Sequence, residues 1–359
     1  MLFMKKGLSL ILAVLLVFSC ASIVGGGAEA PVGEFTAFCQ NVAGLPDISF
    51  VFGDERTDVK NNQKVIGTFV SDHAYDIFAT QEDFGYHDTL VEALPDYAYQ
   101  TSHHGGVPYG DGTNVFTRSM PLYNEKHITW NSLYGIADDG ADEFSQKGIT
   151  YVCIEVADGV FVDFYNIHAD AYGDEGSVAA RQDNFRQLAQ RINLRTVSRP
   201  VIVTGDFNAF VFNDNSLLKE TLIDGCGLKD AWTELYNGGD YTDCSSFIES
   251  NGGVWTDKWG VWDSVERFLY KDGGGVTLTC TEFEYVWITD AQGRNCSDHA
   301  GAYAKFSYNA ENAKESIGSD IKVVKPDPLT ELVRRIVGFF KALILGIRNF
   351  DKVREYFNF

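Results

Sequence analysis

The chain has 359 residues, with 50 acidic and 29 basic side chains and a formal net charge of −21 at pH 7. Because affinity for nucleic acids comes largely from lysine and arginine residues that neutralise phosphates, this balance excludes a broad polyanion-binding surface and leaves room only for a local one. The length is sufficient for one large domain or two modest ones with a substantial core.

The N-terminus has the pattern of an export signal. Lys5 and Lys6 precede an apolar run that begins at Leu8, and small residues follow as far as Ala30. We therefore predict a signal peptide over residues 1–30 and a mature protein that is secreted or held at the cell surface. The six cysteines beyond the signal are compatible with disulfides or with buried thiols, and their spacing does not determine a pairing.

Short apolar runs separated by turn residues recur between residues 33 and 290 and predict a strand-rich chain of the mixed α/β class. These runs are GEFTAFCQNV (33–42), YDIFATQED (75–83), NVFTR (114–118), GITYVCIEV (148–156), VFVDFYNIH (160–168), PVIVTGDFN (200–208), ERFLYK (266–271) and EYVWITD (284–290). The spacing of apolar residues predicts one helix over residues 178–192, with Val178, Phe185 and Leu188 on one face, and another helix over residues 60–69.

Residues 209–262 form a long stretch without a regular pattern, and they contain four tryptophans among glycines and aspartates. Long loops often carry recognition, whereas large aromatic side chains are usually buried for their area alone. The sequence leaves both interpretations open and favours packing of the tryptophans beneath the loop.

Polar side chains follow several of the predicted strands at the point where each apolar run ends. They are Asn41, Glu82, His168, Asp206, Asn208, Asp298 and His299. Taken singly, each has an ordinary structural explanation, such as an Asx-turn, a solvated turn, a cap or a core histidine. Their recurrence at strand ends predicts instead that several strands deliver ligands to one rim of the molecule.

These residue types suit the hydrolysis of a phosphate ester. A divalent cation requires carboxylate oxygens, which Glu82 would supply with help from Asn41 or Asp298. His299 suits the general base because a neutral imidazole titrates near the working pH, and a carboxylate facing its other nitrogen would orient the ring. His168 would donate a hydrogen bond to a phosphoryl oxygen as charge develops.

Five strings, NVAGLP, TQED, YNIHADA, TGDFNA and CSDHAG, occur in this order, and together they resemble the endonuclease/exonuclease/phosphatase superfamily, the deoxyribonuclease I-like fold. The resemblance extends over residues 35–308, which we assign to one catalytic domain. It implies a four-layered α/β sandwich, in which two packed mixed β-sheets are flanked by helices. It also implies a divalent cofactor, Mg²⁺ or another cation such as Mn²⁺ or Ca²⁺.

The resemblance implies a role for each polar residue of these strings. Asn41 and Glu82 match metal-site positions, and we add Asp298 as a further candidate metal ligand. Asp206 and Asn208 match the pair that positions water and phosphate.

The two histidines and one glutamate complete the implied machinery. His299 matches the general base, and His168 matches the second histidine, which contacts the transferred phosphate. Glu266 stands where the family commonly has an aspartate that orients the base, so its extra methylene departs from the pattern. The predicted substrate-binding residues are Asn114, Arg118 and Asp170.

The predicted substrate, that is, which phosphodiester is cleaved, depends on finer features of the resemblance. The NVAGLP start, the stretch GDGTNVFTRSMPL (110–122) and YNIHADA look more like secreted sphingomyelinase and phospholipase C-type members than like deoxyribonuclease I. Arg118 is followed by Ser119, where nuclease-type members tend to carry a glutamate. We therefore predict a secreted phosphodiesterase that cleaves a phospholipid head-group bond.

Three alternatives remain open at this point. The first is a secreted endonuclease of the deoxyribonuclease I type, with nucleic acid as the substrate. The second is hydrolysis of sugar, inositol or small organic phosphates. A non-catalytic binding module on the same fold is the third, although such a module would have lost the base or the metal carboxylate, and both are present.

Beyond the catalytic domain, we predict a linker over residues 309–327 and an amphipathic helix over residues 328–350. Apolar residues recur there at three- and four-residue steps, with basic residues such as Arg334 and Arg335 on the other side. A membrane-spanning helix would place Lys341 near the bilayer centre, at a cost of about 2.5–3.5 kcal/mol. We predict that the helix lies flat on an anionic membrane, while docking on the protein itself or on a second copy remains the alternative.

Overall fold

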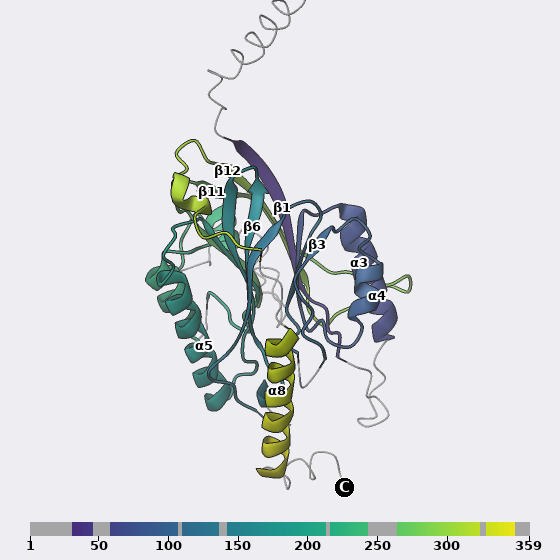
Figure 1. Cartoon of the computed structure of the whole chain (residues 1–359). Helices are drawn as coiled ribbons and strands as arrows, with labels where there is room; N and C mark the ends of the chain where they lie inside the picture. Colours follow the sequence, from purple (N-terminus) through teal and green to yellow (C-terminus); the bar gives the residue numbers. More distant parts are fainter. Residues whose placement is uncertain are drawn as a thin grey trace, which may run out of the picture.

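A computed structural model describes residues 31–45, 58–106, 110–135, 142–212, 216–242, 264–323 and 328–348. Within these ranges the chain forms two six-stranded sheets that lie face to face, with helices outside them (Figure 1). The predicted signal peptide, Cys244 and three of the four tryptophans of residues 209–262 lie outside the described residues. Trp232 is described and is buried, as the packing interpretation predicts.

The first sheet has the strand order β11-β12-β1-β2-β4-β3. β1 and β2 are parallel, and the other neighbours are antiparallel, so the sheet is mixed. The strands are β1 (Val32–Asn41), β2 (Ile77–Gln81), β3 (Tyr99–Gln100), β4 (Asn114–Thr117), β11 (Thr277–Val286) and β12 (Gly301–Asn309).

The second sheet has the strand order β5-β6-β7-β8-β10-β9. β7 and β8 are its parallel pair, and the remaining pairs are antiparallel. The strands are β5 (Leu122–Thr129), β6 (Gly148–Ala157), β7 (Val160–His168), β8 (Val201–Asp206), β9 (Lys229–Asp230) and β10 (Glu266–Lys271).

The α-helices are α3 (Val59–His73), α4 (His87–Glu92), α5 (Glu175–Asn193), α6 (Ala231–Tyr236) and α8 (Pro328–Arg348). α3 and α4 lie on one side of the two sheets and α5 lies on the other (Figure 1). Shorter helical turns are η2 (Asp142–Phe144), η3 (Lys219–Asp224) and η4 (Glu315–Gly318). Both long domain helices begin at an aspartate whose side chain accepts backbone N–H groups of the first turn, Asp58 for α3 and Asp174 for α5.

The layers follow from the alternation of side chains along each strand. In β1, Phe35, Ala37 and Cys39 face the core between the sheets, whereas Phe38 faces outward. Phe38 packs in a second cluster with Ile66 of α3 and other residues of α3 and α4. This arrangement confirms the predicted class of two packed mixed sheets flanked by helices.

The predicted strands match the structure best where the apolar runs are long and β-branched. β5 and β12 were missed, and β11 begins at Thr277 instead of near Glu284. β5 is an edge strand with polar, partly exposed residues and has no strong apolar period. β12 does carry a period of two, since Ala302, Ala304, Phe306 and Tyr308 are buried in alternation, so its pattern was readable and was overlooked. The shortest elements, β3, β9, α4 and α6, were also missed.

The segment after β12 differs from the predicted linker. Ile317 of η4 is buried, and Asp320 forms ion pairs with Arg195 and Arg199. The backbone N–H of Lys322 donates to Asn124 Oδ1 (2.9 Å). The residues from Ile317 to Lys322 therefore pack against the second sheet, where buried apolar and charged groups hold them.

α8 lies next to η2 and carries a row of exposed apolar side chains, including Leu332, Ile336 and Phe340. Among the described residues, no helix combines the length and apolarity needed to cross a membrane.

Candidate active site

The strand register brings the predicted polar residues to one edge of the two sheets. Asn41 ends β1, and Glu82 directly follows β2, which runs parallel to β1. In the second sheet, Asp206 ends β8 and is paired with His168 of β7 and with Glu266 of β10. The carboxyl ends of parallel strands share one edge of a sheet, so side chains far apart in the sequence meet there.

Asp206 lies at the centre of this edge and is 1% exposed. Its Oδ2 atom accepts a hydrogen bond from Asn41 Nδ2 (3.1 Å) and lies 3.5 Å from His168 Nε2 and 3.9 Å from His299 Nδ1. Burial raises the pKa of Asp206, an effect that the nearby His299 charge opposes. Asp206 thus links residues of both sheets through a single oxygen atom.

The same aspartate closes its strand with a tight turn. Its Oδ1 atom accepts the backbone N–H of Asn208 (2.9 Å), and Asn208 has a φ of 48°. Asn208 Nδ2 in turn donates to the Ala169 carbonyl (3.1 Å). Gly205 has a φ of 137°, and a Cβ atom there would lie 2.0 Å from the carbonyl oxygen of Ile167, so the close pairing of β7 and β8 requires glycine.

Asn41 and Glu82 connect the first sheet to this centre. Asn41 Nδ2 donates to Glu82 Oε1 (3.1 Å) as well as to Asp206, while Asn41 Oδ1 accepts the backbone N–H of Ala43 (3.0 Å). In this arrangement Asn41 presents its amide nitrogen to the carboxylates and holds them in place. The role of Asn41 as a metal ligand stays a prediction, since an oxygen ligand would require its amide to turn over.

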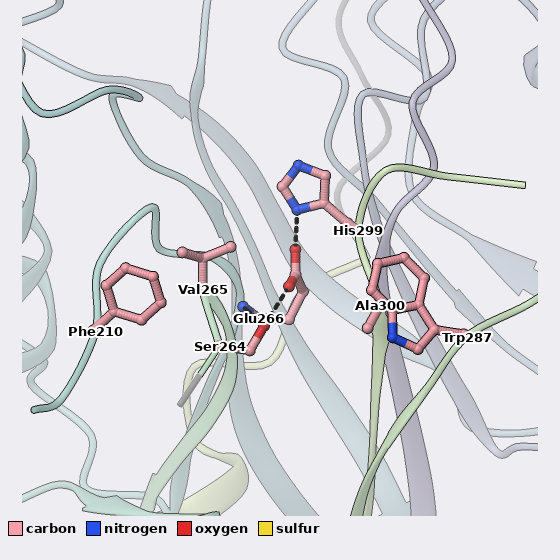
Figure 2. A pocket seen from close by; sticks show the side chains of 7 residues that line it. All are labelled: Phe210, Ser264, Val265, Glu266, Trp287, His299 and Ala300. Atoms are coloured by element: carbon pink, nitrogen blue, oxygen red, sulfur yellow. Dashed lines mark hydrogen bonds and ion pairs between the residues drawn. The ribbon is translucent and has the colours of Figure 1, made fainter. Parts of the chain in front are cut away.

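His299 and Glu266 form the closest contact of the site (Figure 2). His299 Nδ1 lies 2.5 Å from Glu266 Oε1, and Glu266 Oε2 accepts a hydrogen bond from Ser264 Oγ (2.9 Å). The extra methylene of this glutamate is therefore accommodated. Asp298 is exposed, and it is Glu266 that contacts the Nδ1 atom. His299 Nε2 lies on the side of the ring away from Glu266 (Figure 2).

The two histidines of the site have opposite pKa shifts. Burial lowers the pKa of His299, but the Glu266 and Asp206 carboxylates outweigh burial and hold it well above its usual value. Burial, assisted by the Lys147 and His299 charges, holds the pKa of His168 well below its usual value. His168 is therefore neutral, and at 1% exposure its predicted contact with the phosphate remains a prediction.

Lys147 is a residue of the site that the sequence analysis missed. Its Nζ atom lies 2.5 Å from Asp142 Oδ1, and both side chains are buried. Its charge also lowers the pKa of Glu82, which burial raises most and which the Asp298 charge raises further. One signal could have identified Lys147. This lysine directly precedes a buried strand, β6, which is antiparallel to the strand of His168, β7.

The three predicted substrate-binding residues lie in different places. Asn114 is buried and donates from Nδ2 to Asp83 Oδ2 (2.9 Å), so it supports the turn that carries Glu82. Asp170 is also buried, its Oδ2 accepts the backbone N–H of Tyr134 (2.7 Å), and burial raises its pKa to about 7. Contact of either residue with substrate stays a prediction.

The strand topology corrects the prediction that Arg118 binds substrate. β4 is antiparallel to β2, with Thr80 opposite Asn114 and Ile77 opposite Thr117, so Arg118 lies at the edge of the sheet opposite the site. There it donates to the Ala74 carbonyl (3.2 Å). Arg118 is too far along the strand to act on a substrate bound near Glu82.

The donors at the opening of this edge fit a hard divalent cation. Among the polar residues at this edge, three are partly or fully exposed: Glu82, Asp298 and His299. Asn41 and Asp206 are buried. Burial and then the Asp298 charge raise the pKa of Glu82, and a divalent cation bound to both carboxylates would oppose this effect. The carboxylates of Glu82 and Asp298 are thus the candidate ligands.

A second feature of the opening is apolar. The pocket beside His299 and Glu266 is lined by Phe210, Val265 and Trp287 (Figure 2). Trp287 is 40% exposed, so part of an aromatic surface adjoins the proposed base.

Comparison with known proteins identifies a family for the chain. The sequence matches the Endonuclease/Exonuclease/phosphatase family over residues 40–299. Proteins named sphingomyelinase from Mycobacterium bovis and Mycobacterium tuberculosis are 28% identical over 288 residues, which cover 78% of this chain and 54% of those proteins. The chain therefore spans about half the length of these curated relatives.

Solved structures show the same fold at lower identity. D. rerio TDP2 in complex with a single-strand DNA product has a TM-score of 0.56 and 15% identity, covering 76% of this chain and 99% of that one. Beta toxin from Staphylococcus aureus with bound magnesium ions has a TM-score of 0.52 and 15% identity, covering 79% of this chain and 100% of that one. The predicted deoxyribonuclease I-like sandwich is confirmed.

Proposed function

Because the chain belongs to the Endonuclease/Exonuclease/phosphatase family, we propose that it is a metal-dependent phosphodiesterase that hydrolyses a phospholipid head-group bond by in-line attack of water. The observation that carries this proposal is the His299–Glu266 pair, held beside Asp206 at the strand ends and close to the carboxylate of Glu82.

The protein side chains divide the work of the reaction. Glu266 accepts the Nδ1 proton of His299, which leaves Nε2 as the atom that takes the proton of the attacking water. The water oxygen forms the new bond to phosphorus while the bond to the leaving oxygen breaks. Asp206 and Asn208 position the water and the phosphate, and buried Asn41 holds the carboxylates of Asp206 and Glu82 in register.

Glu82 and Asp298 would hold the cofactor, with Mg²⁺ as the first choice and Mn²⁺ or Ca²⁺ as alternatives. The chemistry supplied by such a cation is neutralisation of charge on the phosphate and on the leaving oxygen. Support for magnesium comes from the donor set, which consists of oxygens at the opening, and from the magnesium ions bound in the beta toxin neighbour.

Three observations favour a lipid substrate. The mycobacterial relatives are named sphingomyelinases, the net charge of −21 disfavours a polyanion, and Phe210 and Trp287 place an apolar wall beside His299. A nucleic acid is the second candidate because TDP2, which shares the fold, was solved with a DNA product.

We further propose that the protein acts outside the cytoplasm, as a secreted or cell-surface enzyme, and contacts the membrane through residues 328–350. The N-terminal pattern of basic and apolar residues supports export. The exposed apolar side chains of α8, interspersed with basic residues, support contact with an anionic lipid surface.

A side-by-side assay tests the proposal. The purified protein with Mg²⁺ is offered sphingomyelin vesicles, phosphatidylcholine vesicles and plasmid DNA, and we expect release of the phosphorylated head group from lipid. Chelation should abolish turnover, and His299→Ala should lower kcat by about a hundredfold or more without unfolding the protein. Cleavage of DNA alone would replace the lipid proposal, and near wild-type activity of both His299→Ala and Glu82→Gln would refute the assigned machinery.

A further inference from the structure

A second cluster of metal-ligating side chains lies outside the catalytic residues. It consists of His104 and Asp111, from the segment between β3 and β4, and His127 of β5. Asp111 Oδ2 lies 2.7 Å from His127 Nδ1 and 3.2 Å from His104 Nδ1. One ligand atom from each residue lies within 4.8 Å of the other two. Two imidazole nitrogens and one carboxylate oxygen thus converge on a common space.

Glu125 orients the cluster from outside. Its Oε1 atom lies 3.1 Å from His127 Nε2 and accepts the backbone N–H of Ser102 (2.8 Å). A carboxylate on the far nitrogen of a histidine places the proton there and leaves the near nitrogen with its lone pair, as in carboxylate–histidine–metal arrangements. With an ion bound, His127 would keep its proton on Nε2 and offer Nδ1 to the metal, in place of the contacts that Nδ1 makes with Asp111 (2.7 Å) and Thr150 (3.1 Å).

We infer that His104, Asp111 and His127 form a structural site for a divalent transition metal, with Zn²⁺ as the best fit, separate from the hard-cation site at Glu82. Two nitrogens and one oxygen are typical of zinc, whereas Mg²⁺ and Ca²⁺ take oxygen ligands. Ligand atoms around a tetrahedral zinc ion are about 3.3 Å apart. The separation of Asp111 Oδ2 and His104 Nδ1, 3.2 Å, matches this value, whereas the 2.7 Å hydrogen bond between Asp111 Oδ2 and His127 Nδ1 would have to lengthen around an ion. The side chain of His104 is 10% exposed, which gives an ion and a fourth ligand such as water a way in.

A neighbouring cluster, formed by Asp83, His87 and His103, is less suited to a metal. The rings of His87 and His103 are stacked at 4.0 Å with an interplanar angle of 4°. A metal ion lies in the plane of each imidazole that binds it, and two parallel stacked planes share no such point. His103 Nε2 is also engaged with the Asp83 carbonyl (2.9 Å). The ring centroids of His104 and His127 are 3.5 Å apart and the rings are inclined by 35°, so these two rings are not parallel.

The position of the proposed site gives it a structural role. His104 and Asp111 belong to a segment of the first sheet, and His127 belongs to the second sheet, so one ion would join the two. Gly112, next to Asp111, accepts the backbone N–H of Asp83 (3.0 Å), which directly follows Glu82. An ion at the site would therefore brace the turn that presents Glu82 to the active site.

A proton is the competing occupant of the same space. Burial lowers the pKa of His127, but Asp111 and Glu125 outweigh burial and raise it to about 9. Without a metal, the cluster can exist as a charged histidine between two carboxylates, and binding of an ion must displace that proton. The experiment below separates the two states.

The test measures metal directly on the full chain. After treatment with a chelator and dialysis, the protein is given one equivalent of Zn²⁺ or Co²⁺ in millimolar Mg²⁺, which occupies oxygen-only sites. We expect one tightly bound zinc by elemental analysis, a visible absorption spectrum of tetrahedral Co²⁺ with nitrogen ligands, and a higher Tm with zinc. Glu82→Gln, which alters the catalytic site, should retain the ion.

Variants locate the ion. His104→Gln and Asp111→Asn should lose it, and Glu125→Gln should weaken its binding by about 10- to 100-fold. His103→Gln, in the adjacent cluster, and the exposed His73→Gln are the matched controls and should bind as the wild type does. Two outcomes would overturn the inference. The first is that the folded wild-type protein binds neither zinc nor cobalt. The second is that Glu82→Gln abolishes metal binding while His104→Gln leaves it intact. Because the readout is bound metal, failure here leaves the proposed phosphodiesterase activity untouched.

Discussion

His299 and His168 lie on either side of Asp206, yet their surroundings give them opposite properties. Contact with Glu266 makes His299 more basic in spite of burial, whereas His168 is buried next to positive charge and becomes less basic. Glu266 holds the Nδ1 atom of His299 and leaves Nε2 for the proton of the attacking water, so the assignment of His299 as the base rests on this contact.

The pH dependence of the reaction tests this pairing. The pKa of His299 is raised, so the neutral form that accepts a proton grows as the pH rises through this raised value. Glu266→Gln removes the largest raising effect, and we expect the acidic limb of the kcat/KM profile to shift to lower pH while the plateau falls. The profile of both proteins is measured at saturating Mg²⁺. An unshifted limb, together with a crippling effect of Asp298→Asn, would assign the orienting role to Asp298.

Lys147 and Asp142 provide the second prediction at this scale. Breaking a buried ion pair by removing one partner costs about 3–5 kcal/mol, because the other charge stays buried without compensation. Lys147→Met should lower the free energy of unfolding by about that amount, as measured by chemical denaturation. The double variant Asp142→Asn/Lys147→Met should recover part of the stability.

The same double variant distinguishes structure from chemistry. If Lys147 serves the site through its charge, the double variant stays folded but has a lower kcat/KM than the wild type. Full activity would restrict Lys147 to a structural role. Lys126→Met, at an exposed position of β5, is the control for loss of a lysine. It should change neither the free energy of unfolding nor kcat/KM.

At the scale of elements, the parallel pairs β1–β2 and β7–β8 matter most for the site. Each pair ends at the same edge and carries polar residues there, and the antiparallel strand β10 begins at that edge with Glu266. Elements whose ends lie elsewhere contribute packing alone, which is why Arg118 at the far end of β4 is outside the site.

α8 supplies the prediction at this scale. A chain that ends at Asp327 should keep activity on a soluble phosphodiester but lose sedimentation with anionic vesicles and activity on them, because the exposed apolar and basic side chains of α8 would be absent. Zwitterionic vesicles serve as the control surface. Equal sedimentation of the truncated and full-length proteins with anionic vesicles would show that α8 packs on protein and does not anchor the enzyme.

At the scale of the molecule, the site exists only when the two sheets are docked. Asn41 and Glu82 come with the first sheet, and His168, Asp206 and Glu266 come with the second. Phe306 of β12 stacks on Phe35 in its own sheet, with ring centroids 5.6 Å apart, and contacts Tyr270 of the facing sheet at 5.4 Å.

The Phe306 ring allows a test of whether the site depends on the docking of the two sheets. Phe306→Ala should lower the free energy of unfolding by about 3–5 kcal/mol, since it leaves a cavity between the sheets. The temperature at which activity disappears should fall together with the Tm. The conservative Phe306→Leu should cost less in both measurements. A large loss of stability with no change in the temperature dependence of activity would contradict the dependence of the site on sheet docking.

The amino-acid sequence by itself determined the class of fold, the family and the polar residues that end the apolar runs. Apolar runs that end at Asn41, Glu82, His168 and Asp206 carry this information locally, because a buried strand and its polar end are readable in consecutive residues. The order of the strings along the chain then identified the domain.

Only the tertiary structure decided which groups act on one another. Lys147, the oxygen of Glu266 that contacts His299, and the cluster of His104, Asp111 and His127 depend on strand register and on the docking of the two sheets. These contacts join residues that are between five and 33 positions apart, and the local pattern around each residue is the same whether or not its partner is present. The pKa shifts likewise arise from burial and neighbouring charge, which exist only after the chain has folded.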